Sequence, residues 1–315
     1  MQLTGLHHVT AVSADVRSNY RFYTGTMGMR LVKRSVNQDD VSAYHLFYAD
    51  AAGSPGTDLT FFDWDVPRER RGVRSFARTY LRVHGYDALS YWAERLTASG
   101  VPNSGVFERD ARLTLEFEDP EGQRLGLVDD EGRGDQPRTW DRSPVPPEFQ
   151  IRGLGPVLLS VQDASRTEIV LTRVMGMHQA RIYTDGGVGS VRVYETEEGG
   201  AHAEVHVVEQ RDVPVARPGA GGVHHVAFRT PNETEYQAWL ERLRSAGIPN
   251  SGPVDRYYFR SLYFHEGNGL LFEIATDGPG FAVDEDPETL GEQVALPPFL
   301  EPRREEILAG LKPIE

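Results

Sequence analysis

The chain has 315 residues, long enough for two ordinary domains, and a formal net charge of -14 at pH 7. The acidic balance argues against nucleic acid as a partner, and the absence of cysteine excludes disulfides, thiolate metal ligands and a cysteine nucleophile, so a metal would need His, Asp or Glu ligands. No apolar run is long enough to span a bilayer and no leader pattern opens the sequence, which predicts a cytoplasmic protein without a membrane partner.

Four segments along the chain share one predicted order of elements: a short alternating strand, a helical stretch and several strand-like runs. The opening strands are predicted at residues 6–12, 76–83, 157–161 and 223–228. The helix is clearest over residues 234–246, where Tyr236, Leu240 and Leu243 fall on one face and Gly247 supplies a stop. The sequence therefore predicts an α+β protein of four tandem βαβββ modules.

An internal repeat supports this division. Residues 91–105 (YWAERLTASGVPNSG) match residues 238–252 (AWLERLRSAGIPNSG) at a constant offset of 147, and such self-similarity indicates duplicated modules. The predicted parts are a pair of modules at 1–130, a linker at 131–150, a second pair of modules at 151–276, and a tail at 277–315 that is a candidate lid.

Paired histidines open the first and the last module at the same place in the predicted strand. These pairs are His7 with His8 and His224 with His225. Strand alternation puts the two members of a pair on opposite faces. The second member of each pair shares its face with small residues, which leave space in front of the ring, so His8 and His225 are predicted to point inward.

Glu273 is a single carboxylate in an otherwise apolar strand, GLLFEIA. A buried carboxylate without a cation is unfavourable, so Glu273 should have a charged or metal partner. Two neutral imidazoles and one carboxylate form the facial triad of non-haem Fe(II) oxygenases, which leaves coordination positions open for substrate and oxygen. A single strand histidine is equally well explained as a hydrogen-bonded core residue, but the duplicated position and the isolated Glu273 favour a metal site made by His8, His225 and Glu273.

A competing group of ligand types lies in the third module. His202, Glu204 and His206 alternate along one predicted strand face, whereas the intervening residues form an apolar face. This pattern favours a polar set that faces water rather than a metal site. Four further histidines are interpreted as packing or surface residues: His45, His84, His178 and His265.

The ordered set of motifs resembles a known family. The motifs are LHHVT at 6–10, FYTGTMGMRLVKR at 22–34, YHLFYAD at 44–50, GSPGT at 53–57, and the stretches 222–228 and 258–273. Together with the βαβββ modules, they are similar to the vicinal oxygen chelate superfamily and, over nearly the whole chain, to hydroquinone ring-cleaving dioxygenases of the chlorohydroquinone 1,2-dioxygenase type. This resemblance implies a vicinal oxygen chelate fold in which the modules form two open cup-shaped barrels.

The resemblance also implies a cofactor and partners. It implies Fe(II), or alternatively Mn(II), held at His8, His225 and Glu273, with a small aromatic substrate and O2 as reaction partners, and it leaves a homo-oligomer open. Residues at matching places are implied to support the reaction from around the metal: His7, Thr10, His224, Arg256 and Tyr263. The chain departs from the family pattern at Tyr257, where a small residue is expected after Arg256, and this departure bears on the shape of the pocket.

Two other functions fit the same fold. The first is a metal-dependent isomerase or lyase of the glyoxalase type, which would resemble a site with four ligands. The place in the first module that corresponds to Glu273 falls near Thr60, and Asp58 is the nearest carboxylate, so three ligands favour oxygen chemistry. The second is a small-molecule binding protein without turnover, which would not need an open metal site.

The distribution of ligands predicts how the modules pair. In the two middle modules, the places that correspond to the histidine and glutamate ligands hold Pro156, Arg78 and Gly126. The first and last modules together carry the complete set. We therefore predict that these two form the active cup, and that the second and third modules form a metal-free partner cup.

Overall fold

The computed structural model describes residues 1–196 and 199–314; positions 197, 198 and 315, which fall in the predicted third module and tail, lie outside the described residues. The first module consists of β1 (Leu6–Ser13), α1 (Val16–Arg21), a π-helical turn η1 (Phe22–Thr26), β2 (Arg30–Val36), β3 (Tyr44–Ala49) and β4 (Asp58–Asp63). The second consists of β5 (Ser75–Val83), α2 (Gly85–Ala98), β6 (Asn103–Arg109), β7 (Arg112–Glu118) and β8 (Arg124–Asp129).

The second half repeats this order after a connection that contains the short helix η2 (Pro147–Phe149). The third module consists of β9 (Leu154–Val161), α3 (Ala164–Ile169), a π-helical turn η3 (Val170–Val174), β10 (His178–Asp185), β11 (Gly189–Glu195), η4 (Ala201–Ala203) and β12 (Glu204–Glu209). The fourth consists of β13 (Val223–Thr230), α4 (Glu233–Ser245), β14 (Val254–Asp255), β15 (Arg260–His265) and β16 (Leu271–Thr276). The π-helical turns occur in the same module of each half, as expected of a duplication.

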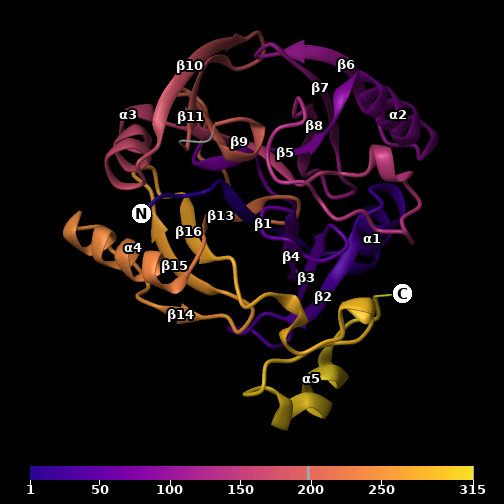
Figure 1. Cartoon of the computed structure of the whole chain (residues 1–315). Helices are drawn as coiled ribbons and strands as arrows, with labels where there is room; N and C mark the ends of the chain where they lie inside the picture. The colour runs from indigo at the N-terminus through magenta and orange to yellow at the C-terminus, as the bar shows by residue number, and fades with distance from the viewer. Residues whose placement is uncertain (197–198, 315) are drawn as a thin grey trace.

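In the described part of the chain, these strands form two curled sheets of eight strands each. One has the order β14-β15-β16-β13-β1-β4-β3-β2 and combines the last module with the first; the other has the order β10-β11-β12-β9-β5-β8-β7-β6 and combines the two middle modules. Figure 1 shows this arrangement, with the indigo and orange segments side by side in the lower sheet. The predicted fold class and the predicted pairing of modules are both confirmed.

The fourth helix illustrates why these residues fold as predicted. The side chain of Asn232 caps the first turn of α4 by accepting a hydrogen bond from the backbone N–H of Glu235. Tyr236 and Leu243 belong to its buried face, and Gly247 follows the helix with φ +68°, a conformation that favours glycine. The observed helix is shifted by one residue from the predicted range.

The C-terminal tail contains the short helices η5 (Phe281–Val283), η6 (Pro287–Thr289), η7 (Glu301–Arg303) and α5 (Arg304–Gly310). It runs along β2, which is the edge strand of its sheet: the backbone N–H of Ala295 donates to the carbonyl of Arg34 at 2.9 Å. Lys33, fully buried, forms ion pairs with Asp284, at 2.7 Å, and with Glu285. The tail thus covers a strand edge that would otherwise be exposed. Its role as a lid stays a prediction.

We expect Gly291→Ala to destabilise the protein by about 2 kcal/mol, because two effects add. The φ of Gly291 is +77°, and an added Cβ would lie 1.9 Å from the carbonyl oxygen of Leu31, so the tail would have to move off β2. Gly280→Ala is the matched control, since its φ is +90° but an added Cβ meets nothing within 4 Å. Thermal unfolding of both variants measures the difference; equal losses would contradict the close packing of Gly291.

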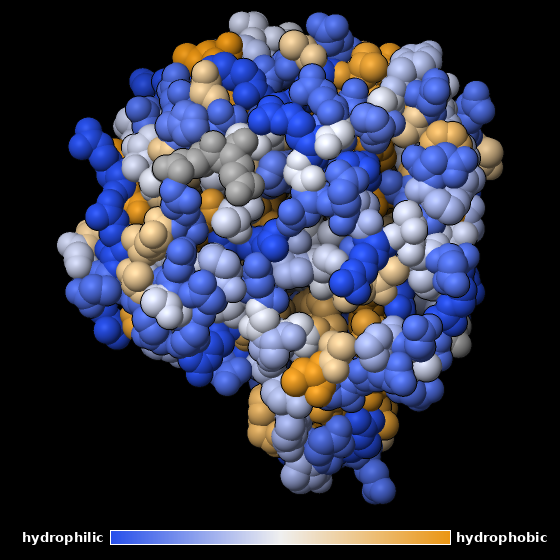
Figure 2. All heavy atoms as spheres, viewed as in Figure 1, coloured by the Kyte–Doolittle hydropathy of each residue, from blue (hydrophilic) through white to orange (hydrophobic). Residues whose placement is uncertain are grey.

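A helix that spans a bilayer must be long and apolar. Among the described helices, none combines the length and the apolar character that crossing a bilayer requires. The face shown in Figure 2 is mostly hydrophilic, with hydrophobic side chains in small separate groups, which is normal for a protein surface.

Candidate metal centre

Two β-bulges place the paired histidines at the seam between the first and last modules. The pairing of β1 with β13 skips His7 in one strand and His224 in the other, and each skipped residue is the extra residue of a bulge. Alternation predicted that the members of a pair point to opposite faces, and this is wrong. The Nδ1 atoms of His7 and His8 are 2.9 Å apart, and those of His224 and His225 are 2.8 Å apart. The inward direction of His8 and His225 nevertheless agrees with the prediction.

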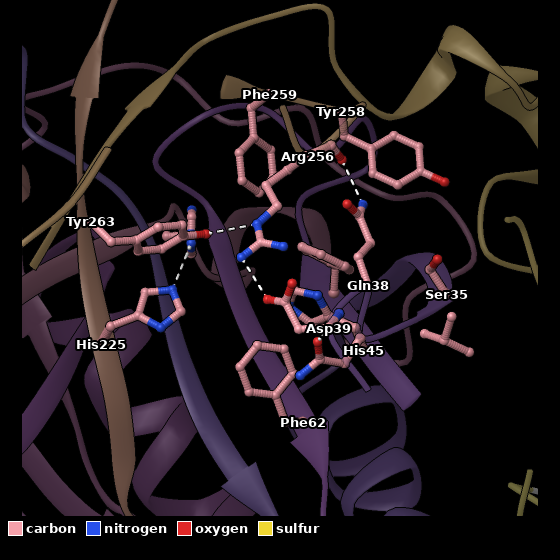
Figure 3. Close-up of a pocket in the computed structure, with 14 residues that line it drawn as sticks. Ser35, Gln38, Asp39, His45, Phe62, His225, Arg256, Tyr258, Phe259 and Tyr263 are labelled. Atoms are coloured by element: carbon pink, nitrogen blue, oxygen red, sulfur yellow. Dashed lines mark hydrogen bonds and ion pairs between the residues drawn. The ribbon is translucent and has the colours of Figure 1, made fainter. Parts of the chain in front are cut away.

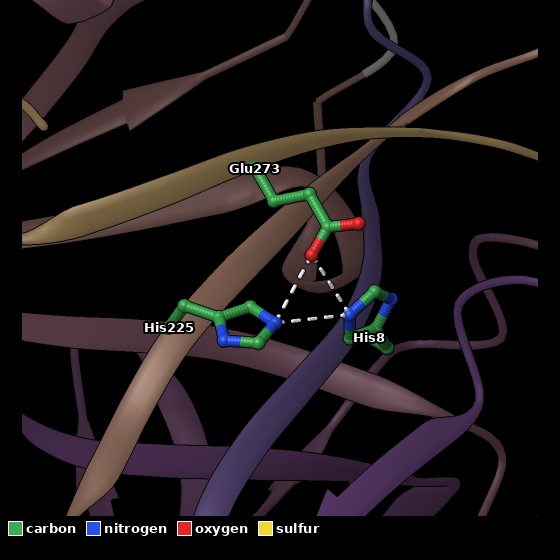
Figure 4. Close-up of side chains that lie close together, drawn as sticks. All are labelled: His8, His225 and Glu273. Atoms are coloured by element: carbon green, nitrogen blue, oxygen red, sulfur yellow. Dashed lines mark hydrogen bonds and ion pairs between the residues drawn. The ribbon is translucent and has the colours of Figure 1, made fainter. Parts of the chain in front are cut away.

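Three ligand atoms converge between β1, β13 and β16 (Figure 4). Oε2 of Glu273 lies 3.2 Å from Nε2 of His8 and 3.0 Å from Nε2 of His225, and the two Nε2 atoms are 3.3 Å apart. Bonds of about 2.1 Å at right angles around a divalent ion place neighbouring ligand atoms about 3 Å apart. The observed triangle has these dimensions.

The environment of Glu273 supports a cation at this position. Its side chain is fully buried, and apart from the two imidazoles its carboxylate oxygens have no hydrogen-bond partner among the described residues. Burial alone would raise the pKa of Glu273, but the adjacent His8 and His225 lower it well below its usual value, whereas burial lowers the pKa of His225. A carboxylate beside a neutral imidazole is the protonation state that a divalent metal binds.

The neighbouring histidine His7 sets the orientation of His8. Burial is the main cause that lowers the pKa of His7 to about 3, so its imidazole is neutral. Its Nε2 lies 3.0 Å from the carbonyl oxygen of Thr276 and must carry the proton, because a carbonyl only accepts. Nδ1 of His7 then accepts from Nδ1–H of His8, which leaves Nε2 of His8 unprotonated and directed at Glu273.

A cavity of about 40 Å³ opens beside the three ligand atoms (Figure 3). Inside it, Nε of Arg256 donates to the hydroxyl of Tyr263 at 3.2 Å, and Nη2 donates to Asp39 at 2.8 Å. Burial and the charge of Glu273 raise the pKa of Tyr263, so the phenol keeps its proton. The cavity is lined by His8, Ser35, Val36, Asn37, Gln38, Asp39, His45, Phe47, Phe62, His225, Arg256, Tyr258, Phe259 and Tyr263.

The departure at Tyr257 has a structural explanation. Its φ is +70°, in the region that favours glycine, which is why a small residue is expected at this place. Tyr257 is not among the described residues that line the cavity, whereas Arg256 is. Tyr257 therefore does not line the pocket itself, but its ring packs against Tyr258, which does, with ring centroids 5.2 Å apart.

Sequence reasoning missed His45 as a site residue. Its ring packs against Phe47 and Phe62, in keeping with a packing role, but it also lines the cavity. The signal available in the sequence was its place in YHLFYAD, one of the motifs that carry the family resemblance. The other three single histidines, His84, His178 and His265, are exposed, which agrees with their interpretation as packing or surface residues.

The prediction that His202, Glu204 and His206 face water together is wrong. His202 belongs to η4, before the strand begins, and Glu204 and His206 are buried inside the second cup. Arg112 donates two hydrogen bonds of 2.8 Å to the carboxylate of Glu204, and Nη2 of Arg181 lies 2.9 Å from it. Glu204 thus has guanidinium partners, which Glu273 lacks, and this argues against a cation at Glu204.

Strand register identifies the place of a fourth ligand. Ala227, two residues after His225, lies opposite Glu273 in the parallel pair β13–β16. Thr10, two residues after His8, lies opposite Thr60 in the corresponding pair β1–β4. Thr60 is therefore the counterpart of Glu273, and its hydroxyl lies 2.8 Å from that of Thr10. Asp58, two residues earlier, is buried, and burial raises its pKa well above the usual value, which favours the neutral acid over a carboxylate ligand.

Comparisons with known proteins agree with this geometry. Residues 5–127 and 153–283 match the family model described as Glyoxalase/Bleomycin resistance protein/Dioxygenase superfamily. A Bacillus subtilis protein named "Putative ring-cleaving dioxygenase MhqA" is 48% identical over all of both chains, and a Sphingobium indicum protein named "Chlorohydroquinone/hydroquinone 1,2-dioxygenase" is 29% identical over 98% of this chain and 95% of its own. A crystal structure described as a "putative dioxygenase" from Bacillus subtilis superimposes with a TM-score of 0.90 at 34% identity, covering 100% of this chain and 98% of the other. The chain belongs to the Glyoxalase/Bleomycin resistance protein/Dioxygenase superfamily.

Proposed function

We propose that this protein is an Fe(II)-dependent ring-cleaving dioxygenase that opens a hydroquinone-type aromatic ring with O2. The observation that carries the proposal is the buried group of His8, His225 and Glu273 at the edge of a cavity: two imidazoles and one carboxylate are the ligands of oxygen-activating Fe(II) centres. The names of the relatives support the same reaction class. Mn(II) is the alternative metal.

The chemistry that Fe(II) supplies when bound is electron transfer between a phenolate and O2. The protein holds the aromatic substrate in the cavity beside the ligand atoms, where its walls include Phe47, Phe62 and Phe259. Fixing the reactants at one place removes much of the entropic barrier of their encounter. The apolar walls also exclude water, which strengthens every electrostatic contact in the cavity.

Tyr263 and Arg256 are the groups placed to act on the oxygen atoms of the reaction. The Tyr263 oxygen accepts from Arg256, so its own proton stays available for an acceptor in the cavity. Arg256 brings a positive charge next to this proton and stabilises negative charge that develops there. His7 and His224 would orient the two histidine ligands through their Nδ1 atoms, and Thr10, whose hydroxyl lies 3.0 Å from Nε2 of His225, would lie next to the metal.

The counterpart of Glu273 in the first module disfavours a glyoxalase-type isomerase or lyase. A four-ligand site would need a carboxylate there, and Thr60 supplies a hydroxyl that contacts Thr10 and His45 instead. A binding protein without turnover would have no use for a proton donor next to the ligand atoms. Both rival functions nevertheless make distinct experimental predictions.

Anaerobic reconstitution with Fe(II), followed by measurement of oxygen uptake with hydroquinones and catechols, tests the proposal. We expect iron-dependent uptake and a ring-opened product, identified by mass spectrometry as the substrate plus both oxygen atoms. Reconstitution with Mn(II) in parallel identifies the metal. Turnover of the methylglyoxal–glutathione adduct without oxygen uptake would establish the isomerase instead, and tight binding without any turnover would establish the binding protein.

A further inference from the structure

His45 lies in the wall of the cavity, and its ring contacts two aromatic rings. It is part of β3, and its ring centroid lies 3.9 Å from that of Phe47 and 4.5 Å from that of Phe62. Its Nε2 lies 3.0 Å from the hydroxyl of Thr60. Two aromatic contacts and one hydrogen bond therefore fix the direction of its other ring nitrogen.

That other nitrogen, Nδ1, is the part of His45 that is available to a ligand. No residue in the described ranges forms a hydrogen bond with it. The atom is not fully buried, and His45 lines the cavity. Burial, reinforced by the nearby His8 and His225, lowers the pKa of His45 well below its usual value. A neutral ring nitrogen recognises a neutral hydroxyl rather than a carboxylate or a phosphate.

A chain of hydrogen bonds sets the distance between His45 and the metal ligands. Nε2 of His225 lies 3.0 Å from the hydroxyl of Thr10, this hydroxyl lies 2.8 Å from that of Thr60, and Thr60 contacts His45. Nε2 of His45 is therefore at most three hydrogen-bond lengths from the ligand atom of His225, and Nδ1 belongs to the same ring, so one aromatic substrate can reach both places. In Figure 3, His45 and His225 lie on either side of the Arg256 side chain.

We propose that His45 binds the second hydroxyl of the substrate, on the side of the ring away from the metal ligands, and so selects diols whose hydroxyls are separated across the ring. This inference rests on the proposed function, since it assumes that the first hydroxyl is held beside His8, His225 and Glu273.

Other polar groups in the cavity are less suited to this contact. Arg256 is already engaged by Tyr263 and Asp39, and Gln38 donates its amide to the backbone carbonyl of Arg256. Tyr258 donates its hydroxyl to Asp284. His45 combines a fixed ring, a free nitrogen and a place on a strand rather than on a loop.

The test is calorimetric binding of hydroquinone and of phenol, without oxygen, to the Fe(II)-loaded protein and to His45→Phe, which keeps an aromatic ring but removes the nitrogen. We expect the wild type to bind hydroquinone about tenfold more tightly than phenol, as one lost hydrogen bond predicts. His45→Phe should lose this preference while its affinity for phenol stays unchanged. His45→Asn, with a shorter hydrogen-bonding group, should keep part of the preference, and it replaces His45→Phe if that variant does not fold.

The controls separate this inference from the proposed function. His178→Phe makes the same replacement at an exposed site and should leave both affinities unchanged. A wild-type preference that survives in both His45→Phe and His45→Asn, or a wild type without any preference for hydroquinone, overturns the role of His45 while leaving the dioxygenase intact. Failure of both compounds to bind the wild type overturns the proposed function and this inference together.

Discussion

Glu273→Ala is expected to abolish metal binding while the protein stays folded. The carboxylate is the one anionic ligand of the group, and its loss leaves two neutral imidazoles that hold a divalent ion weakly. Folding should survive because the variant deletes a fully buried charge that has no guanidinium or ammonium partner. The measurement is iron per chain after anaerobic reconstitution and desalting, together with thermal unfolding of the metal-free protein.

Glu204→Ala is the matched control for this variant. Glu204 is also a fully buried glutamate in a strand, but Arg112, Arg181 and His206 surround its carboxylate. Removing it leaves two guanidinium groups without their shared partner, which costs about 3 kcal/mol of stability, and iron content should be unchanged. Undiminished iron in Glu273→Ala would assign Glu273 to the core, and loss of iron in Glu204→Ala would place a metal in the second cup.

The sequence predicted the fold well because the fold depends on repetition. The match between residues 91–105 and 238–252 indicated duplicated units, and the hydrophobic face of residues 234–246 located a helix to within one residue. The pairing of the first module with the last also followed from the sequence, since only those two modules carry histidine at the ligand place of the opening strand. These inferences rest on patterns within single elements and on the comparison of equivalent places.

Features that depend on how strands meet could not be predicted. The bulges at His7 and His224 arise from the register between two strands more than 200 residues apart in the sequence, so strict alternation gave the wrong relation between paired histidines. Glu204 has an alternating polar pattern that normally faces water. It is buried because the second sheet curls until Arg112, 92 positions away, reaches its carboxylate.

Tyr263→Phe is expected to retain iron and to lower kcat about 100-fold, the loss typical of removing one proton donor or oxyanion contact. The hydroxyl of Tyr263 lies in the cavity, accepts from Arg256 and has its own proton free, whereas the ring alone contributes only to the cavity wall. Because burial raises the pKa of Tyr263, the phenol stays protonated near neutral pH, and the effect should not depend on pH in that range.

Tyr44→Phe is the matched control for Tyr263→Phe, because the hydroxyl of Tyr44 also accepts a hydrogen bond from an arginine, Arg34, at 3.2 Å. The guanidinium carbon of Arg34 lies 5.5 Å from the ring centroid of Tyr44, close to the 5.3 Å between Arg256 and the ring of Tyr263. Tyr44 is not among the described residues that line the cavity. Loss of the Tyr44 hydroxyl should therefore leave kcat near the wild-type value and change only the stability of the protein. Steady-state oxygen uptake at saturating hydroquinone, normalised to iron content, compares the two variants. Equal rates for Tyr263→Phe and the wild type would assign Tyr263 to packing, and an equal fall in both variants would trace the effect to a lost arginine contact rather than to a proton donor at the reacting oxygen.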